Sequence, residues 1–220
     1  MATIYIVPEW FFKLSLGLEL VFSIVTLIVA IYALRVYRIF EQREVKLLST
    51  SFFLISISYL MKAALNLFVL KEVREGVRIL NYNSLNTIGI LGFYSYVILF
   101  MTGLVTLTYI TFKIKNWRVY SLILATNLII IFFNNDKAFA FNLLSSILLF
   151  YVVIHYSIEY KNKKNSKTLL VLLAFIALFL SGLGFVFAEN YYANYVIGHL
   201  LELASYLLML TSLILTIRKK

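Results

Sequence analysis

Long apolar stretches separated by short charged segments run through this sequence from beginning to end. A helix needs about 20 consecutive apolar residues to cross the hydrocarbon core of a bilayer. Seven such stretches lie between the charge clusters, at residues 14–34, 47–70, 85–112, 119–133, 138–158, 168–188 and 193–217. The pattern predicts an all-α integral membrane protein, with residues 1–220 forming a single domain built as a seven-transmembrane-helix bundle.

The composition excludes a water-soluble domain. The chain is 62% hydrophobic and 14% charged, with a mean hydropathy of +0.92, so its polar residues are too few to cover a soluble surface. The apolar stretches are about twice as long as a barrel strand and lack a two-residue alternation, so helices are predicted in place of a β-barrel. The shortest stretch, 119–133, must stand nearly upright or extend into its flanks.

The distribution of lysine and arginine predicts the direction of the chain. Fourteen of them fall in segments on one side of the spans and five on the other, with Lys62 inside a span. Because cytoplasmic loops carry the excess, we expect the N-terminus outside and the C-terminus inside, in a multi-pass protein of the cell membrane. The net charge of +10 is spread over several loops, so we expect the lipid bilayer and no nucleic acid as partner.

Three of the predicted helices each carry a polar face. Residues three or four positions apart share one face of a helix, and the first, second and last helices can be neighbours once a seven-helix ring closes. We therefore predict a polar pocket between them in the outer half of the membrane, with Lys62 between Glu19 and Glu202 and with His199 on the outer side of the acids. The candidate ligand- or ion-binding residues are Glu19, Lys62, Asn66, His199, Glu202 and Tyr206.

Two interpretations of this polar group stay open. The charges can form a buried network that only fixes helix register, or they can form a binding or proton-handling site, since ionisable groups inside a membrane are often functional. The chain has no cysteine and two histidines, so no thiolate chemistry is available and no catalytic residue, metal or cofactor is predicted. Four glycines in predicted spans are expected at close helix contacts: Gly89, Gly92, Gly182 and Gly184.

Two families of seven-helix proteins are excluded by the residues that their sites require. Seven spans with an outside N-terminus look like a microbial rhodopsin, but the last span, 193–217, has no lysine to bind retinal and the third, 85–112, has no acid for a counter-ion. Seven-helix zinc hydrolases of the ceramidase and progestin-receptor type use several histidines, more than this chain supplies.

The last span contains the string HLLELASYLLMLTSLI at residues 199–214. It resembles the closing helix of prokaryotic seven-helix sensory regions, which begins with a histidine on a leucine-rich face. The resemblance implies a stand-alone sensor that passes its state to another membrane or signalling protein on the cytoplasmic side. Abundant Ile, Tyr, Lys and Asn with no Cys would suit a prokaryotic, archaeal or other, source.

The leading prediction is thus a non-enzymatic membrane protein that is sensor-like, or that is an accessory, partner-binding protein. The first alternative is a proton- or cation-coupled transporter of small solutes. An intramembrane enzyme, with His199 and Glu202 as acid and base, ranks third.

Overall fold

Seven α-helices make up the structure, a computed structural model that describes residues 9–74, 82–113, 116–188 and 192–217, with side chains in 14–67, 89–113, 116–188 and 193–215. The helices are α1 (Glu9–Phe40), α2 (Arg43–Arg74), α3 (Tyr82–Thr111), α4 (Trp117–Phe133), α5 (Lys137–Lys163), α6 (Ser166–Val186) and α7 (Tyr192–Ile217). No strand occurs in these ranges, so the predicted all-α fold is confirmed.

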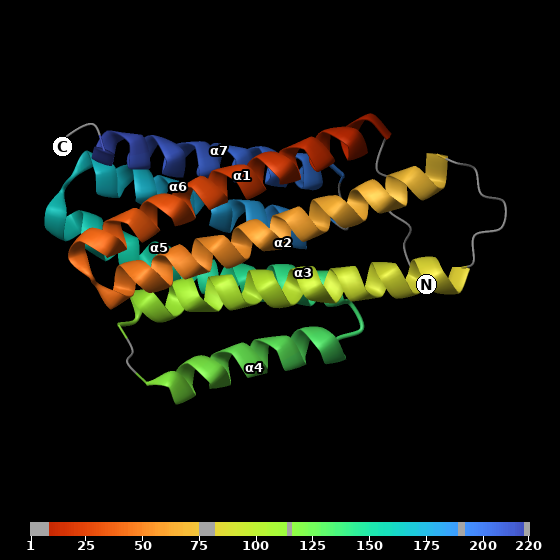
Figure 1. Ribbon diagram of the computed structural model, residues 1–220, viewed down its shortest axis with the longest axis horizontal. Helices are drawn as coiled ribbons and strands as arrows, with labels where there is room; N and C mark the ends of the chain where they lie inside the picture. The colour runs from red at the N-terminus through yellow and green to blue at the C-terminus, as the bar shows by residue number, and fades with distance from the viewer. Residues whose placement is uncertain (1–8, 75–81, 114–115, 189–191, 218–220) are drawn as a thin grey trace.

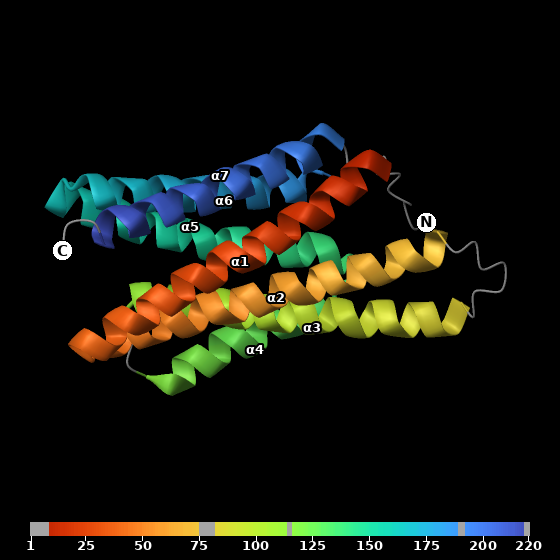
Figure 2. The same cartoon turned by 45° about the horizontal axis from the view of Figure 1, so that its top comes forward.

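Six of the helices are long and apolar enough to cross a membrane, as expected of a multi-pass membrane protein. They form a closed ring in the order α1, α2, α3, α5, α6 and α7, in which α1 contacts α7 (Figure 1). In Figure 2 the ring is seen as two layers, α1 to α3 and α5 to α7, that meet along α1–α7 and α3–α5. The predicted neighbourhood of the first, second and last helices is thereby confirmed.

The fourth helix lies outside the ring, against α3 and α5. It has 17 residues, or about 25 Å at a rise of about 1.5 Å per residue, and only Tyr120, Asn127 and Ile131 are buried. It takes in two flanking residues, Trp117 and Arg118, beyond the predicted stretch. Its start lies beside the end of α3 and its end beside the start of α5, so it runs antiparallel to both neighbours along part of their length (Figure 1).

The helices extend past most of the predicted spans because a helix can continue into the polar region that apolar counting leaves out. Thus α1 ends at Phe40, after Arg35 and Arg38. The third and sixth spans are exceptions at their ends: α3 ends at Thr111, one residue short, and α6 ends at Val186, with Phe187 and Ala188 in a turn. The end of the bundle where α1 begins is named the amino end below, and the opposite end, where α7 finishes, the carboxyl end (Figure 1). The predicted orientation rests on counts of lysine and arginine, and several of the side chains counted are not described by the structure. They are those of Lys13, Lys71, Arg74, Arg78, Lys115 and residues 218–220.

Small and hydroxyl-bearing residues bring α1 and α2 close together on the carboxyl-end side of the predicted site. The hydroxyl of Ser56 donates to the Ser23 carbonyl at 2.8 Å, and the hydroxyl of Ser23 donates to the Ser56 carbonyl at 3.0 Å. The polar and small residues on this face of α1 are all buried: Ser15, Glu19, Ser23, Thr26, Ala30 and Ala33. These reciprocal bonds fix the register in which Glu19 faces α2.

Three of the four glycines expected at helix contacts are confirmed there. A Cβ at Gly92 would meet the Leu65 side chain, one at Gly182 would meet Ser146, and one at Gly184 would lie 3.4 Å from the Cα of Gly198. Gly89 shows no such contact: among the side chains and backbone that the structure describes, no atom lies within 4 Å of the position a Cβ would take. Spacing alone does not tell which face of α3 meets a neighbour.

Candidate functional site

An ion pair between α1 and α2 forms the first part of the predicted polar site. The Nζ atom of Lys62 lies 3.1 Å from Oε1 of Glu19. One turn further along α2, the side-chain amide of Asn66 donates to both carboxylate oxygens of Glu19, at 3.0 and 2.8 Å. Glu19 is 1% exposed, whereas the Lys62 side chain keeps 30% of its surface. The carboxylate is therefore enclosed by two donors, whereas the Lys62 side chain is only partly buried.

A second carboxylate, on α7, has a different set of partners. The phenol of Tyr59 donates to Oε1 of Glu202, and the phenol of Tyr206 donates to the Tyr59 oxygen at 2.9 Å. The Nδ1 atom of His199 lies 3.5 Å from Oε2 of the same acid. All four side chains are buried. Two phenols and a carboxylate thus form a chain of hydrogen bonds from Tyr206 through Tyr59 to Glu202.

Aromatic rings enclose this second carboxylate. Phe22 of α1 packs against Tyr59 and Tyr206, with ring centroids 5.5 and 5.2 Å apart, and stacks at 6.5 Å on His199. The histidine is also flanked edge-on by Phe185 of α6 and Tyr195 of α7. These rings exclude bulk water from the acid, so its hydrogen bonds act in a low-dielectric surrounding.

The two parts adjoin through α2, where Tyr59 and Lys62 are three residues apart and therefore on one face. The Lys62 ammonium also lies 5.5 Å from the ring centroid of Tyr96 on α3, a cation–π geometry. The structure thus brings all six predicted site residues into one interior cluster, named here the amino-half cluster, to which α1, α2, α3 and α7 contribute.

One detail of the predicted arrangement is wrong. Lys62 does not bridge the two acids: among the described residues its ion pair within 4.0 Å is with Glu19, and Glu202 is held by Tyr59. The phenol occupies the position that the prediction gave to the ammonium. His199 does lie one turn nearer the amino end of α7 than Glu202.

Three residues of the cluster were not predicted: Tyr59, Phe22 and Tyr96. The sequence held a signal for Tyr59, which precedes Lys62 by three positions and Asn66 by seven on the same face of α2. Phe22 and Tyr96 gave no such signal, since aromatic residues are frequent throughout the spans.

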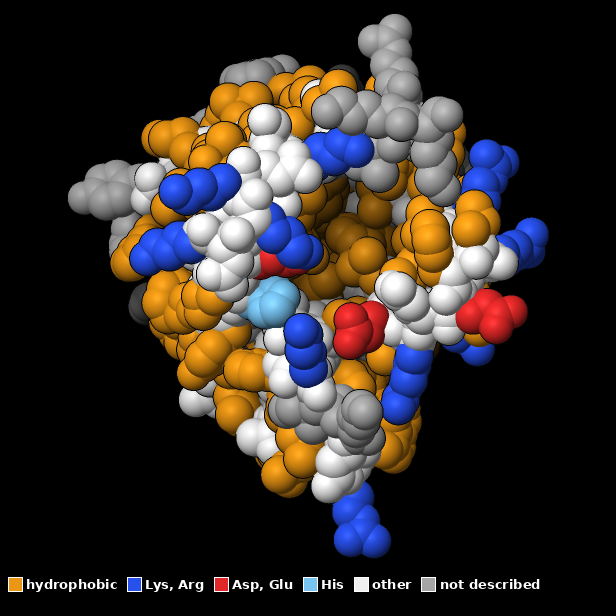
Figure 3. Space-filling view, turned by 90° about the vertical axis from the view of Figure 1, so that its left-hand side faces the viewer, with side chains coloured by type: hydrophobic (Ala, Val, Ile, Leu, Met, Phe, Trp, Pro, Cys, Tyr) orange, Lys and Arg blue, Asp and Glu red, His pale blue; other side chains and the backbone are white. Residues whose placement is uncertain are grey.

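A separate cavity opens at the carboxyl end, where Figure 3 shows the surface hollowed, with hydrophobic side chains in its depth and charged ones around it. It has a volume of about 550 Å³ and lies between the start of α2, the end of α3 and the end of α5. His155 of α5 is among the residues that line it.

The cluster offers an ammonium, two carboxylates, an imidazole and a hydroxyl chain, which can bind a polar group or pass a proton. No group of three His, Asp or Glu side chains in the described parts of the chain is placed to hold a metal ion. Comparisons of the chain with protein-family models, with curated proteins and with solved structures found no match.

Proposed function

We propose that this protein is a non-enzymatic, sensor-like or accessory membrane protein that binds a small polar molecule or a lipid headgroup at the amino-half cluster. The observation that carries the proposal is the unequal burial of the ion pair. Glu19 is 1% exposed, but Lys62 beside it keeps 30% of its side-chain surface. A lysine that served only to neutralise Glu19 would gain most from complete enclosure with it, whereas this side chain keeps open surface beside the carboxylate, along which an anionic or carbonyl group would reach the ion pair.

Binding at Lys62 would be transmitted through the helices that share the cluster. A ligand that draws the ammonium away from Glu19 changes the contact between α1 and α2, and Tyr59 on α2 connects that contact to Glu202 on α7. The proposed recipient is another membrane or signalling protein at the carboxyl end. Ligand affinity for two helix arrangements must differ for such a shift to occur.

Screening small polar compounds and soluble lipid headgroups by thermal shift tests this proposal on the purified protein in detergent. A compound that raises Tm should lose its effect in Lys62→Met and in Glu202→Gln, but keep it in Lys137→Met, which changes a lysine outside the cluster. Glu202→Gln preserves shape and so covers the case in which Lys62→Met fails to fold. Equal responses of all three variants would contradict a ligand site at this cluster.

We further propose that the N-terminus is outside and the C-terminus inside the cell membrane, with α4 as the seventh span. The excess of lysine and arginine on segments of the carboxyl side supports this direction. The natural absence of cysteine makes a direct test simple. In intact cells an impermeant maleimide should label Asn135→Cys, before α5, and should label Lys161→Cys, near its end, only after lysis. The reverse pattern would overturn the orientation, and labelling of both would remove α5 as a span.

The second candidate is proton- or cation-coupled transport. The specific observation in its favour is that the cavity at the carboxyl end lies opposite the amino-half cluster. One half of the bundle thus holds an open cavity and the other holds buried polar groups. Reconstituted vesicles under an imposed proton or sodium gradient should then show solute-dependent flux that Glu202→Gln abolishes. Absence of flux, with ligand binding retained, would leave the sensor proposal standing alone.

A further inference from the structure

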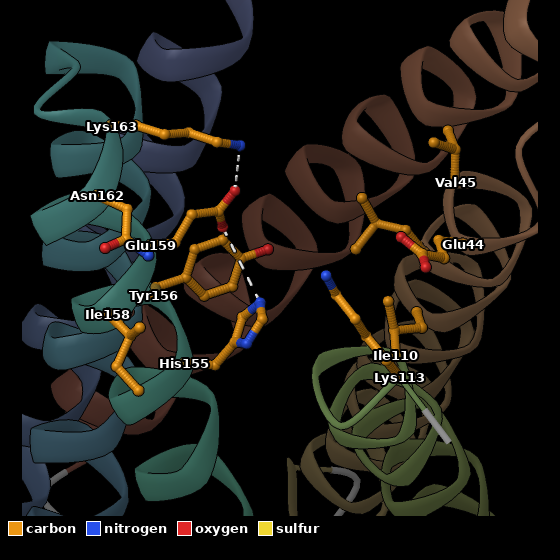
Figure 4. A pocket seen from close by; sticks show the side chains of 11 residues that line it. Glu44, Val45, Ile110, Lys113, His155, Tyr156, Ile158, Glu159, Asn162 and Lys163 are labelled. Atoms are coloured by element: carbon orange, nitrogen blue, oxygen red, sulfur yellow. Dashed lines mark hydrogen bonds and ion pairs between the residues drawn. The ribbon is translucent and has the colours of Figure 1, made fainter. Parts of the chain in front are cut away.

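The cavity at the carboxyl end has the size of a small-molecule site. Its volume of about 550 Å³ falls within the roughly 300–1,000 Å³ range of ligand pockets in proteins. Three helix ends surround it, and Figure 4 shows their side chains facing one another across it. It shares no residue with the amino-half cluster, so an occupant here is independent of the ligand binding proposed at that cluster.

Charged and apolar residues are arranged in two levels along this cavity. On α2, Glu44 is followed four residues deeper by Leu48, and on α5, Glu159 follows Tyr156 by three. At the end of α3, Lys113 follows Ile110 by three. On α2 and α5, residues three or four apart lie on one helix face, so each of these walls carries a charge at the mouth and an apolar group one turn deeper. Lys113 lies in the turn that follows α3, beyond Ile110 of its last turn. The cavity is therefore amphipathic in the direction in which the spans run.

The charges on the α5 wall are already paired. Glu159 lies 2.6 Å from the Lys163 ammonium and 4.0 Å from the His155 imidazole. On the opposite wall, Glu44 and Lys113 take part in no ion pair within 4.0 Å among the described residues. In Figure 4 the amine of Lys113 extends into the cavity, with Glu44 on the same side. One wall thus offers an occupant both a cation and an anion.

We propose that this cavity binds the zwitterionic headgroup and upper acyl chain of a phosphatidylethanolamine-class phospholipid, with the phosphate at Lys113 and the lipid ammonium at Glu44. A purely anionic group would meet two carboxylates in the lining, Glu44 and Glu159, and a purely cationic group would meet two lysines. A zwitterion satisfies both free charges. The apolar level formed by Leu48, Ile110 and Tyr156 receives the acyl chain, and the mouth stands at the helix ends, at the depth where headgroups lie.

Native mass spectrometry of the detergent-solubilised protein titrated with defined lipids tests the proposal. Phosphatidylethanolamine should bind with saturation and more tightly than phosphatidylcholine, whose methylated ammonium cannot donate a hydrogen bond to Glu44, or than anionic phosphatidylglycerol. Glu44→Gln and Lys113→Gln should each weaken binding about tenfold or more, since each removes a charge-assisted hydrogen bond. Matched controls are Glu41→Gln and Lys161→Gln, which change exposed charges at the same end without lining the cavity.

Each other outcome overturns a defined part of the proposal. Equal binding of phosphatidylglycerol, with Glu44→Gln silent, would make this an anion site. Equal binding of phosphatidylcholine, with Glu44→Gln silent, would remove the role of the ammonium. Water-soluble phosphoethanolamine binding as tightly as the lipid would show that the acyl chain contributes nothing. Equal losses in the variants and their controls, or no saturable binding, would show that the cavity is not a lipid site. Glu44 and Lys113 are exposed, so both variants should fold, and an unchanged Tm verifies this.

Discussion

Two glutamate–lysine pairs lie near opposite ends of this molecule and differ in almost everything except chemistry. Glu19 and Lys62 join two helices at 3.1 Å, with the acid 1% exposed. Glu159 and Lys163 lie on one helix at 2.6 Å, with side chains 30% and 62% exposed. The shorter distance belongs to the exposed pair. Burial, and not distance, therefore decides how much each pair contributes to stability. Each charge of an exposed pair is solvated by water even when its partner is lost, whereas a buried acid depends on its partner.

Glu202 extends the comparison, since it is as deep in the bundle as Glu19 but has no lysine beside it in the described residues. Its partners are the Tyr59 phenol and, at 3.5 Å, the His199 imidazole. Glu19 faces a lysine ammonium at 3.1 Å, whereas Glu202 is held by the Tyr59 phenol and adjoins an imidazole at 3.5 Å. The first contact joins α1 to α2 through an ion pair, and the second joins α2 to α7 through a hydrogen bond.

Loss of the buried cation should have the largest effect. Lys62→Met leaves Glu19 with Asn66 as its remaining donor, and removing one partner of a buried pair costs about 3–5 kcal/mol. The free energy of unfolding, measured by SDS titration in bicelles, should fall by that amount. Adding Glu19→Gln should restore much of it, because the uncompensated charge is then gone. Lys137→Met serves as control, and an equally large loss there would contradict the comparison.

Removal of the phenol beside Glu202 should have a smaller effect. Tyr59→Phe keeps the ring contacts with Phe22 and deletes two hydrogen bonds: the one donated to the buried carboxylate, which is worth about 1.5–3 kcal/mol, and the weaker one accepted from Tyr206. Tyr206→Phe removes only the next bond in the chain and should cost less. If Tyr206→Phe proves the more damaging of the two in the same unfolding assay, the hydrogen-bond chain does not end at Glu202 as described.

The sequence was sufficient to predict the polar faces of α1, α2 and α7, because membrane burial makes each polar residue in a span informative. It was not sufficient to predict which donor meets which acid. Helical phase places Tyr59 and Lys62 on one face of α2, but the choice between them for Glu202 depends on how α2 and α7 are each positioned along α1, which lies between them, and no residue spacing encodes that.

The cavity at the carboxyl end could not be predicted from the sequence, for a related reason. Glu44, Lys113 and Glu159 are each unremarkable as charges at a helix end, and only the arrangement of the ring places them around one hollow. Gly89 makes the same point in α3, since the helix was predicted correctly but no atom of the described residues lies within 4 Å of a Cβ built there.

Gly103 of α3 lies close against α2, so an alanine at this position tests how tightly the two helices pack. A Cβ there would lie 2.9 Å from the Ser51 carbonyl oxygen and 2.8 Å from the Ile55 side chain, so Gly103→Ala must move backbone and should cost about 1–3 kcal/mol. Gly89→Ala, on the same helix in open space, should cause no loss and can gain from alanine's helix propensity. Equal effects of the two in SDS titration would show that α2 and α3 are not packed this closely.

The exposed pair should show the smallest effect of all. Lys163→Gln removes the ammonium 2.6 Å from Glu159, an i, i+4 contact worth about 0.3–0.5 kcal/mol. The variant also removes a positive charge from the last turn of α5, where it interacts with the helix dipole. Lys161→Gln removes a charge from the same turn without breaking the pair, so the difference between the two variants isolates the contact itself. SDS titration should give a difference below about 0.5 kcal/mol that shrinks as salt is added. A difference approaching that of Lys62→Met would mean that burial does not separate the two pairs, and the ranking drawn from Glu19 and Glu159 would have to be abandoned.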